Sequence, residues 1–286
     1  GKAIRVEDAK TRYVNFCKST IPKSFHLKGL KIVLDCANGA TYHIAPPLFC
    51  DLGADLTVLG VKPNGLNINK HSGSTHLDTL QKIVLSEKAD LGIAFDGDGD
   101  RVLMVDSLGE IVDGDELLFL LAQRGIKTGH IQGGVVGTAM SNLGLELALN
   151  ELGLAFIRTS VGDRYVNEAL QTKNWQLGGE ASGHIISRRV SKTGDGIIIA
   201  LQVLEAIQSS GLSLHNAKKA MKKFPQILIN IAAENPSAIV ESPSIKKAIL
   251  LAEKVLMDRG RVLLRPSGTE PVVRVMVEGN NLSEVK

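Results

Sequence analysis

The stretch that decides the fold is Leu91-Gly92-Ile93-Ala94-Phe95-Asp96-Gly97-Asp98-Gly99-Asp100-Arg101, in which an apolar run precedes alternating aspartate and glycine. The apolar run at 91–95 has the length of a buried strand, which places the aspartates in the loop that follows it. Three carboxylates this close repel one another and raise each other's pKa, so a cation is needed to neutralise them. Gly97 and Gly99 can adopt positive φ and aim successive oxygens at one point. The stretch therefore predicts a metal site whose ligands are Asp96, Asp98 and Asp100.

The kind of ligand narrows the choice of metal. Hard oxygen ligands suit Mg²⁺ or Ca²⁺, and Mg²⁺ normally keeps few carboxylates while it also binds substrate phosphate. A calcium EF-hand is excluded, because a loop counted from Asp96 has Arg101 where glycine is required and Ser107 where glutamate is required. A solvated acidic turn stays open, as does a haloacid-dehalogenase-like phosphatase, although Arg101-Val102-Leu103 stands where that family has a Gly-Thr pair. The leading hypothesis is a Mg²⁺ site that handles phosphate.

The composition is typical of an α/β protein with two or three domains. The chain has 286 residues, of which 44% are hydrophobic, with few aromatic residues and many glycines. A formal net charge of +3 gives no clustered basic face, so nucleic acid is not an expected partner. The three cysteines form no CxxC pair, which predicts reduced thiols, with Cys36 in the core. No apolar stretch approaches about 18 residues and no leader opens the chain, so we expect no membrane association and a cytoplasmic protein.

The first part of the chain alternates between helices and strands. The expected elements are a helix over 6–16, a strand over 31–35, a helix over 45–52, a strand over 56–59, a helix over 77–88 and a strand over 91–95. Such βαβ alternation implies a mainly parallel sheet, with ligands at the carboxyl ends of its strands. A hairpin is expected over 101–112, and Asp113 is expected to cap the helix that contains 117–122.

The next part of the chain resembles the first. It has an expected strand at 135–136, a helix that ends in Leu152-Gly153 and a strand at 155–157. These elements correspond in order to the strand at 33–34, the helix that ends in Leu52-Gly53 and the strand at 56–58. After Pro225 we expect a strand over 227–231, a helix over 244–257 and strands near 262–264 and 272–277, with loops at 235–237 and 242–244. The expected fold class is therefore α/β, with two similar mixed or parallel-sheet α/β domains at 1–125 and 126–225 and a smaller α+β domain at 226–286.

A loop near the end of the chain has the composition of an oxyanion cradle. The segment Arg265-Pro266-Ser267-Gly268-Thr269-Glu270-Pro271 lies between two expected strands, and Arg274 follows it. Arg265 can bind phosphate bidentately, Ser267 and Thr269 can donate hydroxyl protons, and Gly268 lets backbone N–H groups approach. An ordinary Ser-Gly hairpin turn stays open as the alternative. The chain has no GxxxxGK[ST] motif, which argues against a P-loop nucleotide hydrolase.

A further glycine-rich loop carries groups suited to sugar hydroxyls. Residues 178–184 place the Glu180 carboxylate, the Ser182 hydroxyl and the His184 imidazole within five residues. His184 is as well explained by a structural hydrogen bond as by ligand binding. A second polar loop, with Gly162 and Asp163, precedes an expected helix.

Taken together and in this order, these loops resemble those of the α-D-phosphohexomutases. That family has a DGDGDR metal loop, a GExSGH sugar loop and an R-x-SGTEP phosphate loop, which correspond here to residues 96–101, 179–184 and 265–271. Three further segments, at 35–40, 64–69 and 73–76, resemble its glucosamine branch. The resemblance covers essentially the whole chain. It agrees with the expected α/β domains and assigns the three loops to one site.

The resemblance implies a reaction and a role for each loop. It implies interconversion of glucosamine 6-phosphate and glucosamine 1-phosphate, through a phosphoserine enzyme and a bisphosphorylated sugar, on the route to UDP-N-acetylglucosamine. Asp96, Asp98 and Asp100 would then hold Mg²⁺, with Arg101 supporting catalysis at the same phosphate. The substrate would be bound by Gly162, Asp163, Glu180, Ser182, His184, Arg265, Ser267, Gly268, Thr269 and Arg274. The expected partners are a hexosamine phosphate and an N-terminal domain of the same enzyme, and a homodimer stays open.

The resemblance also exposes a missing motif. Members of the family carry a catalytic serine in a Ser-His-Asn-Pro setting, and this chain contains no such sequence. The nearest segment, Ser213-Leu214-His215-Asn216, has an inserted leucine and lies in an expected helix. We therefore expect that the chain lacks the serine domain and the C-terminal end, and that it is inactive alone. Two alternatives stay open: a phosphoglucomutase or phosphomannomutase, and a non-catalytic module that binds metal and sugar phosphate.

Overall fold

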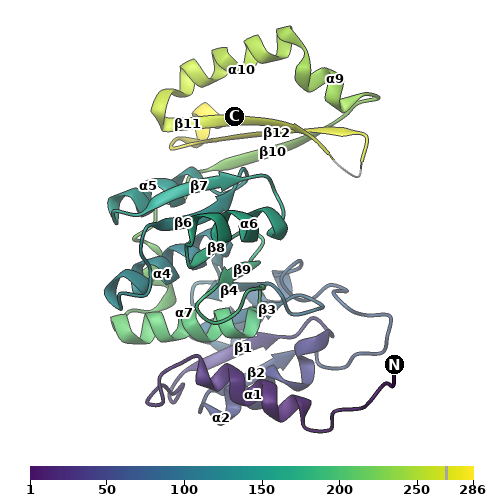
Figure 1. The fold of residues 1–286 in the computed structure, drawn as a ribbon, viewed down its shortest axis with the longest axis vertical. Coiled ribbons are helices and arrows are strands. Elements are labelled where there is room, and N and C mark those ends of the chain that lie inside the picture. The colour runs from purple at the N-terminus through teal and green to yellow at the C-terminus, as the bar shows by residue number, and fades with distance from the viewer. Residues whose placement is uncertain (268–269) are drawn as a thin grey trace. The chain divides into compact units, whose positions relative to one another are not determined.

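The computed structural model describes residues 1–267 and 270–286. The chain divides into two compact units (Figure 1). The first unit comprises Gly1–Met140 and Leu149–Met221, and the second comprises Ser141–Ala148 and Lys222–Lys286. In the described part of the chain, no helix has both the length and the apolar composition needed to cross a membrane.

The first sheet of the first unit follows the expected βαβ pattern. Its strands are β1 (Lys31–Asp35), β2 (Asp55–Leu59), β3 (Leu91–Phe95), β4 (Val102–Asp106) and β5 (Ile111–Val112), in the order β2-β1-β3-β4-β5. Strand β1 pairs in parallel with β2 and β3, whereas β4 is antiparallel to β3 and β5. Its helices are η1 (Ala40–His43), α2 (Ala45–Asp51) and α3 (Asp78–Glu87). Leu80 and Val84 of α3 pack on Val33 of β1, because they form the apolar face of this helix.

The second sheet repeats this arrangement. Its strands are β6 (Gly134–Thr138), β7 (Ala155–Thr159), β8 (Leu177–Gly179) and β9 (Ile185–Ser187), in the order β7-β6-β8-β9. Strand β6 is parallel to β7 and β8, and β9 is antiparallel to β8. The associated helices are α4 (Gly114–Lys127) and α6 (Asp163–Lys173). Helix α5 (Leu143–Glu151) lies between β6 and β7 in the sequence, and its residues 143–148 belong to the second unit. The four strands of this sheet have the order and the directions of β2-β1-β3-β4 in the first sheet, which has β5 in addition, and this confirms the expected similarity of two mixed-sheet α/β domains.

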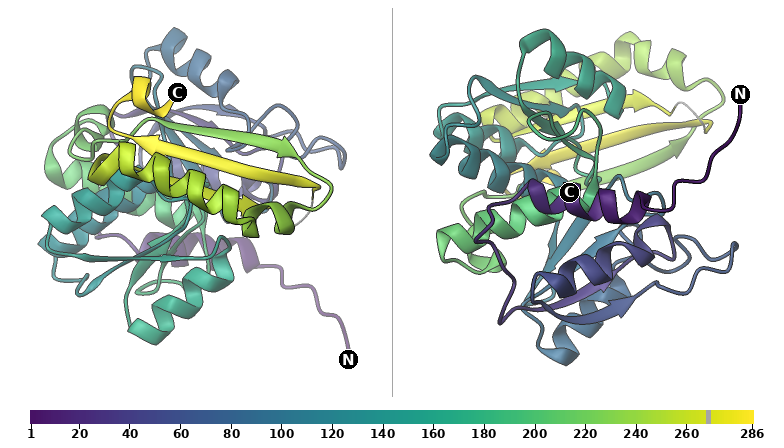
Figure 2. Two further views of the ribbon diagram at one scale, coloured as in Figure 1. Left: turned by 90° about the horizontal axis from the view of Figure 1, so that it is seen from above. Right: turned by 60° about the horizontal axis from the view of Figure 1, so that its bottom comes forward.

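One helix of the first unit was not expected from the sequence. Helix α7 (Gly196–Ser210) is buried along most of its length, and it contacts β3 and β4 of the first sheet as well as α4 and β9. Because it packs on several sides, its sequence is mostly apolar, with Gln202 and Glu205 as the polar residues in the middle of the helix, and it lacks the wide polar face that marks a surface helix. Helix α1 (Ala9–Ser19) lies against α7, as Figure 2 shows, and α8 (Leu214–Lys218) follows it.

The glycine-rich stretch at 178–184 is a hairpin rather than one long loop. Strands β8 and β9 flank a turn at 180–184, so the loop is shorter than the sequence indicated.

The N-terminus of helix α4 agrees with the prediction from the sequence. Asp113 accepts hydrogen bonds from the backbone of Asp115 and Glu116, and with the Glu116 carboxylate it forms a capping box at the N-terminus of α4.

The second unit is a small antiparallel sheet with helices on one face (Figure 1). Its strands are β10 (Gln226–Ala232), β11 (Gly260–Pro266) and β12 (Val272–Gly279), in the order β10-β12-β11. Its helices are α9 (Pro236–Glu241), α10 (Pro243–Leu256), η2 (Met257–Arg259) and α11 (Leu282–Val285). The segments at 235–237 and 242–244 were expected as loops, but each begins a helix. Proline stands in the first turn of each helix, where its missing N–H costs no hydrogen bond.

Candidate active site

The three aspartates of the metal loop converge after β3. One carboxylate oxygen from each of Asp96, Asp98 and Asp100 lies within 4.8 Å of the others. Asp96 is buried, and its Oδ1 accepts the backbone N–H of Arg101 at 3.1 Å, which closes the loop on itself. The convergence follows from the position of the loop at the carboxyl end of a parallel strand, where the chain turns sharply.

Glycines allow the metal loop to approach the neighbouring chain segment. A Cβ on Gly39 would lie 2.1 Å from the carbonyl oxygen of Gly97, so only glycine fits there. The same carbonyl accepts the N–H of Ala40 at 2.7 Å. Gly99 has a φ of +79°, a conformation that L side chains adopt at a cost. These contacts fix the loop against the turn that follows β1.

Asp35 holds that turn, although no role for it was expected from the sequence. Its buried carboxylate accepts the N–H of Ala37 at 2.9 Å and the N–H of Gly73 at 2.8 Å. Burial raises the pKa of Asp35, although these two hydrogen bonds partly offset the rise. The sequence signals were that Asp35 ends a strand, opens a glycine-containing segment and begins the 35–40 segment that resembles the glucosamine branch.

The charges of the metal loop fit a divalent cation. Burial raises the pKa of Asp96 to about 6, the Arg101 N–H lowers it in part, and the neighbouring charge of Asp100 raises it further. Oδ1 of Asp100 is buried and has no hydrogen-bond partner. A buried carboxylate oxygen without a partner is costly. Three converging oxygens of this kind are the donor set that Mg²⁺ prefers.

Arg101 lies beside the same carboxylates. Its Nε is 3.8 Å from Oδ2 of Asp96 and 3.7 Å from Oδ1 of Asp100. The side chain is 42% exposed, and Nε has no hydrogen-bond partner. The guanidinium therefore keeps donors free for an anion at the edge of the metal loop.

A second group of possible metal ligands is already neutralised by a lysine side chain. Asp106, Glu110 and His215 also converge, but Nζ of Lys218 lies 2.8 Å from both the Asp106 and the Glu110 carboxylates. Burial opposes the charge on Lys218, but the two carboxylates outweigh this effect and raise its pKa. This group is therefore an ion-pair network that joins α8 to the β4–β5 hairpin.

The β8–β9 hairpin is bonded directly to the metal loop. His184 forms an antiparallel bridge with Arg101, and its Nδ1 lies 3.0 Å from Oδ2 of Asp100. The N–H of Val102 donates to the carbonyl of Gly183 at 3.1 Å. A Cβ on Gly183 would lie 2.2 Å from the Val102 carbonyl oxygen, which explains the glycine. His184 thus orients a metal-loop carboxylate, and its contact with substrate stays a prediction.

The turn of this hairpin also contacts the second polar loop, at residues 162–163. Oε1 of Glu180 accepts the N–H of Gly162 at 2.9 Å, and Gly162 directly precedes α6. Asp163 begins that helix and is exposed, as is Ser182 in the turn. The structure therefore brings the metal loop, Glu180 and the 162–163 loop into one region of the first unit.

The expected phosphate loop lies in the second unit. Arg265 of β11 and Arg274 of β12 are register partners, and Nε of each is buried without a hydrogen-bond partner. Burial and then the charge of Arg274 lower the pKa of Arg265. The N–H of Ser267 donates to the Val272 carbonyl. Gly268 and Thr269 lie outside the described residues. Nη2 of Arg274 donates to the Glu270 carboxylate at 3.0 Å, but the two Nε donors have no partner and are suited to an anion.

Comparison with known proteins places the chain in a family. Models of the phosphoglucomutase/phosphomannomutase family match residues 11–109 as α/β/α domain II, residues 113–224 as α/β/α domain III and residues 228–286 as the C-terminal domain. The chain belongs to this family. The family models agree with the fold class expected from the sequence.

Two curated relatives of this phosphohexomutase chain are named phosphoglucosamine mutase. The chain is 58% identical over 286 residues to a phosphoglucosamine mutase of Pseudomonas aeruginosa strain LESB58, and it covers 64% of that protein. It is 56% identical over 289 residues to a phosphoglucosamine mutase of Azotobacter vinelandii, again covering 64% of the relative. All of this chain is aligned in both cases. The chain therefore spans about two thirds of the length of these relatives, or slightly less.

Solved structures share the fold at lower identity. An Aspergillus fumigatus N-acetylphosphoglucosamine mutase, solved with GlcNAc-6P and magnesium, superposes with a TM-score of 0.78 at 23% identity, covering 96% of this chain and 67% of that one. A phosphoglucomutase/phosphomannomutase family protein from Burkholderia thailandensis gives a TM-score of 0.78 at 22% identity, covering 96% of this chain and 61% of that one. At this identity the similarity supports the fold.

Proposed function

We propose that the chain is the metal-binding and sugar-phosphate-binding part of a phosphoglucosamine mutase, an isomerase that interconverts glucosamine 6-phosphate and glucosamine 1-phosphate. The observation that carries this proposal is the convergence of the three-aspartate cluster with His184 and Glu180 in the first unit. A site of this kind supplies a cation for a phosphate and polar groups for a sugar side by side. The identity of 58% to a phosphoglucosamine mutase supports the choice of substrate.

The metal in the proposed site is Mg²⁺, held by Asp96, Asp98 and Asp100. When bound, it would neutralise charge on a transferring phosphoryl group. The remaining work falls to side chains around the loop. The Arg101 guanidinium would donate to the same phosphate, as charge-assisted hydrogen bonds to phosphate are strong. The His184 ring, 3.0 Å from Asp100, would keep that carboxylate oriented.

The sugar and its second phosphate would be held by different parts of the chain. Glu180 and Ser182 would accept from and donate to sugar hydroxyls, with Gly162, Asp163 and His184 close by. The phosphate that does not react would bind the second unit, at Arg265, Arg274 and the residues between them, Ser267, Gly268 and Thr269. Because the sugar must react at either end, this division lets one set of groups hold it in both orientations.

The phosphoryl carrier would come from outside this sequence. The chain has no Ser-His-Asn-Pro motif, so we propose that the 286 residues alone do not turn over substrate. An N-terminal domain of the same enzyme would supply the phosphoserine, through which a bisphosphorylated sugar forms. We further propose that the protein acts in the cytoplasm, in the supply of UDP-N-acetylglucosamine for peptidoglycan, and that a homodimer is compatible with this role.

The test is a mutase assay on the longer parent protein, with ³¹P NMR to follow conversion of glucosamine 6-phosphate. We expect Mg²⁺-dependent conversion, and Asp98→Asn should lower kcat by about tenfold or more with a smaller change in KM. Asp55→Asn, the same substitution on the exposed strand β2, is the matched control and should leave kcat unchanged.

Three outcomes would contradict the proposal. Faster conversion of glucose or mannose phosphates would make the enzyme a phosphoglucomutase or phosphomannomutase. Saturable binding of sugar phosphate without conversion would make it a binding module. Turnover by a verified preparation of the 286-residue chain, free of host mutase, would refute the proposed source of the phosphoryl carrier.

A further inference from the structure

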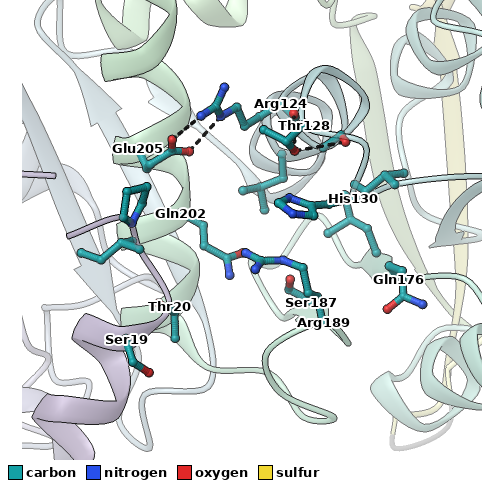
Figure 3. A pocket seen from close by; sticks show the side chains of 16 residues that line it. Ser19, Thr20, Arg124, Thr128, His130, Gln176, Ser187, Arg189, Gln202 and Glu205 are labelled. Atoms are coloured by element: carbon teal, nitrogen blue, oxygen red, sulfur yellow. Dashed lines mark hydrogen bonds and ion pairs between the residues drawn. The ribbon is translucent and has the colours of Figure 1, made fainter. Parts of the chain in front are cut away.

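A cavity of about 390 Å³ lies in the first unit, and Figure 3 shows the side chains that line it. Its walls come from the segment that follows α1, from the C-terminal half of α4, from the middle of α7 and from the outer ends of β8 and β9. The polar groups that matter for its chemistry are Arg124, His130, Ser187, Arg189, Gln202 and Glu205. None of them belongs to the proposed active site.

Helix α7 and strand β9 each run from the metal loop to the cavity, and their lengths keep the two places apart. The N–H of Gly196, at the start of α7, donates to the Gly99 carbonyl of the metal loop. Gln202 lies six residues further along α7, which corresponds to about 9 Å of helix. Strand β9 similarly begins next to His184 and ends at Ser187, which lines the cavity. The cavity is therefore a distinct site and not an extension of the active site.

Gln202 is the first sign that this cavity takes a ligand. Its side chain is only 9% exposed, it lines the cavity, and its Nε2 has no hydrogen-bond partner. A buried donor without an acceptor is destabilising, and native structures normally satisfy such groups. An acceptor atom that enters the cavity, from a ligand or from water, would satisfy this donor.

The charges at the cavity favour an anion. Nε of Arg124 donates to Glu205 at 3.0 Å, so these two charges neutralise each other. Arg189 also lines the cavity and is exposed, and no carboxylate of the described residues lies within ion-pair distance of it. The exposed His130 ring adds a further donor at the rim. One guanidinium at this cavity is therefore without an ion-pair partner, and guanidinium binds carboxylate and phosphate oxygens bidentately.

The remaining wall of the cavity is apolar, and the cavity has the size of a small-molecule site. Leu121, Ile131 and Leu177 line it, and Leu121 and Leu177 are buried. A volume of about 390 Å³ falls within the range of small-molecule pockets, which combine an apolar wall with a few placed polar groups. An inorganic ion would leave most of this wall without a partner.

We propose that this cavity is a second ligand site, which binds a small organic anion with its carboxylate or phosphate on Arg189, an acceptor atom on Gln202 Nε2 and its apolar body on Leu121 and Leu177. The proposal does not depend on the mutase activity. It depends on the free guanidinium, the buried unpartnered amide and the apolar wall in one cavity.

The experiment is an NMR titration of the ¹⁵N-labelled 286-residue chain with phenyl phosphate, benzoate and inorganic phosphate, with benzyl alcohol as the uncharged probe. We expect saturable shifts at the backbone amides of Gln176 and Ser187 with phenyl phosphate or benzoate, and the tighter of the two identifies the head group. Inorganic phosphate should bind this site about tenfold more weakly, and benzyl alcohol should not saturate it. Binding at the proposed phosphate loop would shift residues 265–274 instead, so the two sites are read separately.

Variants decide whether the proposed contacts are correct. Arg189→Ala should weaken binding about tenfold, and Lys173→Ala, which removes an exposed cation of the same domain, should not change it. Gln202→Leu should also weaken binding but should not lower the unfolding midpoint, because it removes an unpartnered buried donor at similar volume. No saturable shift up to about 10 mM organic anion, or equal affinity in all variants, would overturn the proposal.

Discussion

The Asp96→Asn substitution tests the electrostatics of the metal loop most directly. Asparagine keeps the shape of the side chain and the Oδ1 acceptor, which receives the Arg101 N–H at 3.1 Å. It removes the charge that burial and Asp100 disfavour. In metal-free protein we therefore expect the substitution to stabilise the first unit, although it removes a metal ligand.

The magnitude follows from the pKa of Asp96. Folding raises this pKa from 3.8 to about 6. A rise of about two units corresponds to about 3 kcal/mol at 1.36 kcal/mol per unit. For a carboxyl whose pKa is raised by folding, the unfolded chain loses its proton first. The penalty of the ionised group is therefore absent below about pH 4, grows as the pH rises towards about 6 and is constant above that. The variant should gain up to about 3 kcal/mol at pH 8 and almost nothing at pH 4.

The assay is urea unfolding in EDTA at pH 4, 6 and 8, followed by the fluorescence of Trp175, the only tryptophan of the chain, which lies in the first unit. Asp55→Asn, on the exposed strand β2, should show no such pH-dependent gain. Added Mg²⁺ should raise the wild-type midpoint more than that of Asp96→Asn, because binding to the folded state adds stability. A variant that is no more stable than wild type at pH 8, or equally stabilised at pH 4 and pH 8, would refute the reasoning.

Two further predictions concern the phosphate loop and the ion-pair network. In the full-length parent, Arg265→Ala should lower the affinities for glucosamine 6-phosphate, glucose 6-phosphate and inorganic phosphate by similar factors, whereas Glu180→Gln should change the order of affinity of the two sugar phosphates. Calorimetry at fixed ionic strength measures these affinities. If Glu180→Gln lowers all three affinities by the same factor, the assignment of the loops is wrong. Lys218→Met removes the 2.8 Å ion pair from the buried Asp106 carboxylate, which keeps its contact with His215, and should lower the unfolding free energy by about 1–3 kcal/mol. Lys219→Met, at the exposed neighbour, should change it little, and equal urea midpoints for the two variants would show that the pair contributes no stability.

The sequence by itself determined the strands and the chemistry of the loops. The strands at Lys31–Asp35 and Leu91–Phe95 were predicted to the residue, because a short apolar run bounded by polar, glycine-containing loops is typical of a buried strand. The aspartates of the metal loop were predicted to converge because three charges two residues apart need a common partner. The repeated helix-Leu-Gly-strand pattern indicated two similar domains, and the four strands of the second sheet have the order of the first four strands of the first sheet.

Only the tertiary structure decided what lies between the two sheets. Helix α7 is mostly apolar because it is covered on several sides, and a sequence without a wide polar face does not show the period by which a surface helix is predicted. Its burial brings Gly196 to the metal loop and Gln202 to the cavity, and no local pattern encodes either contact. The bond between His184 and Asp100 likewise joins residues that are 84 positions apart. Local sequence fixes periodicity and turn chemistry, whereas the partner of a side chain depends on which distant segment packs against it.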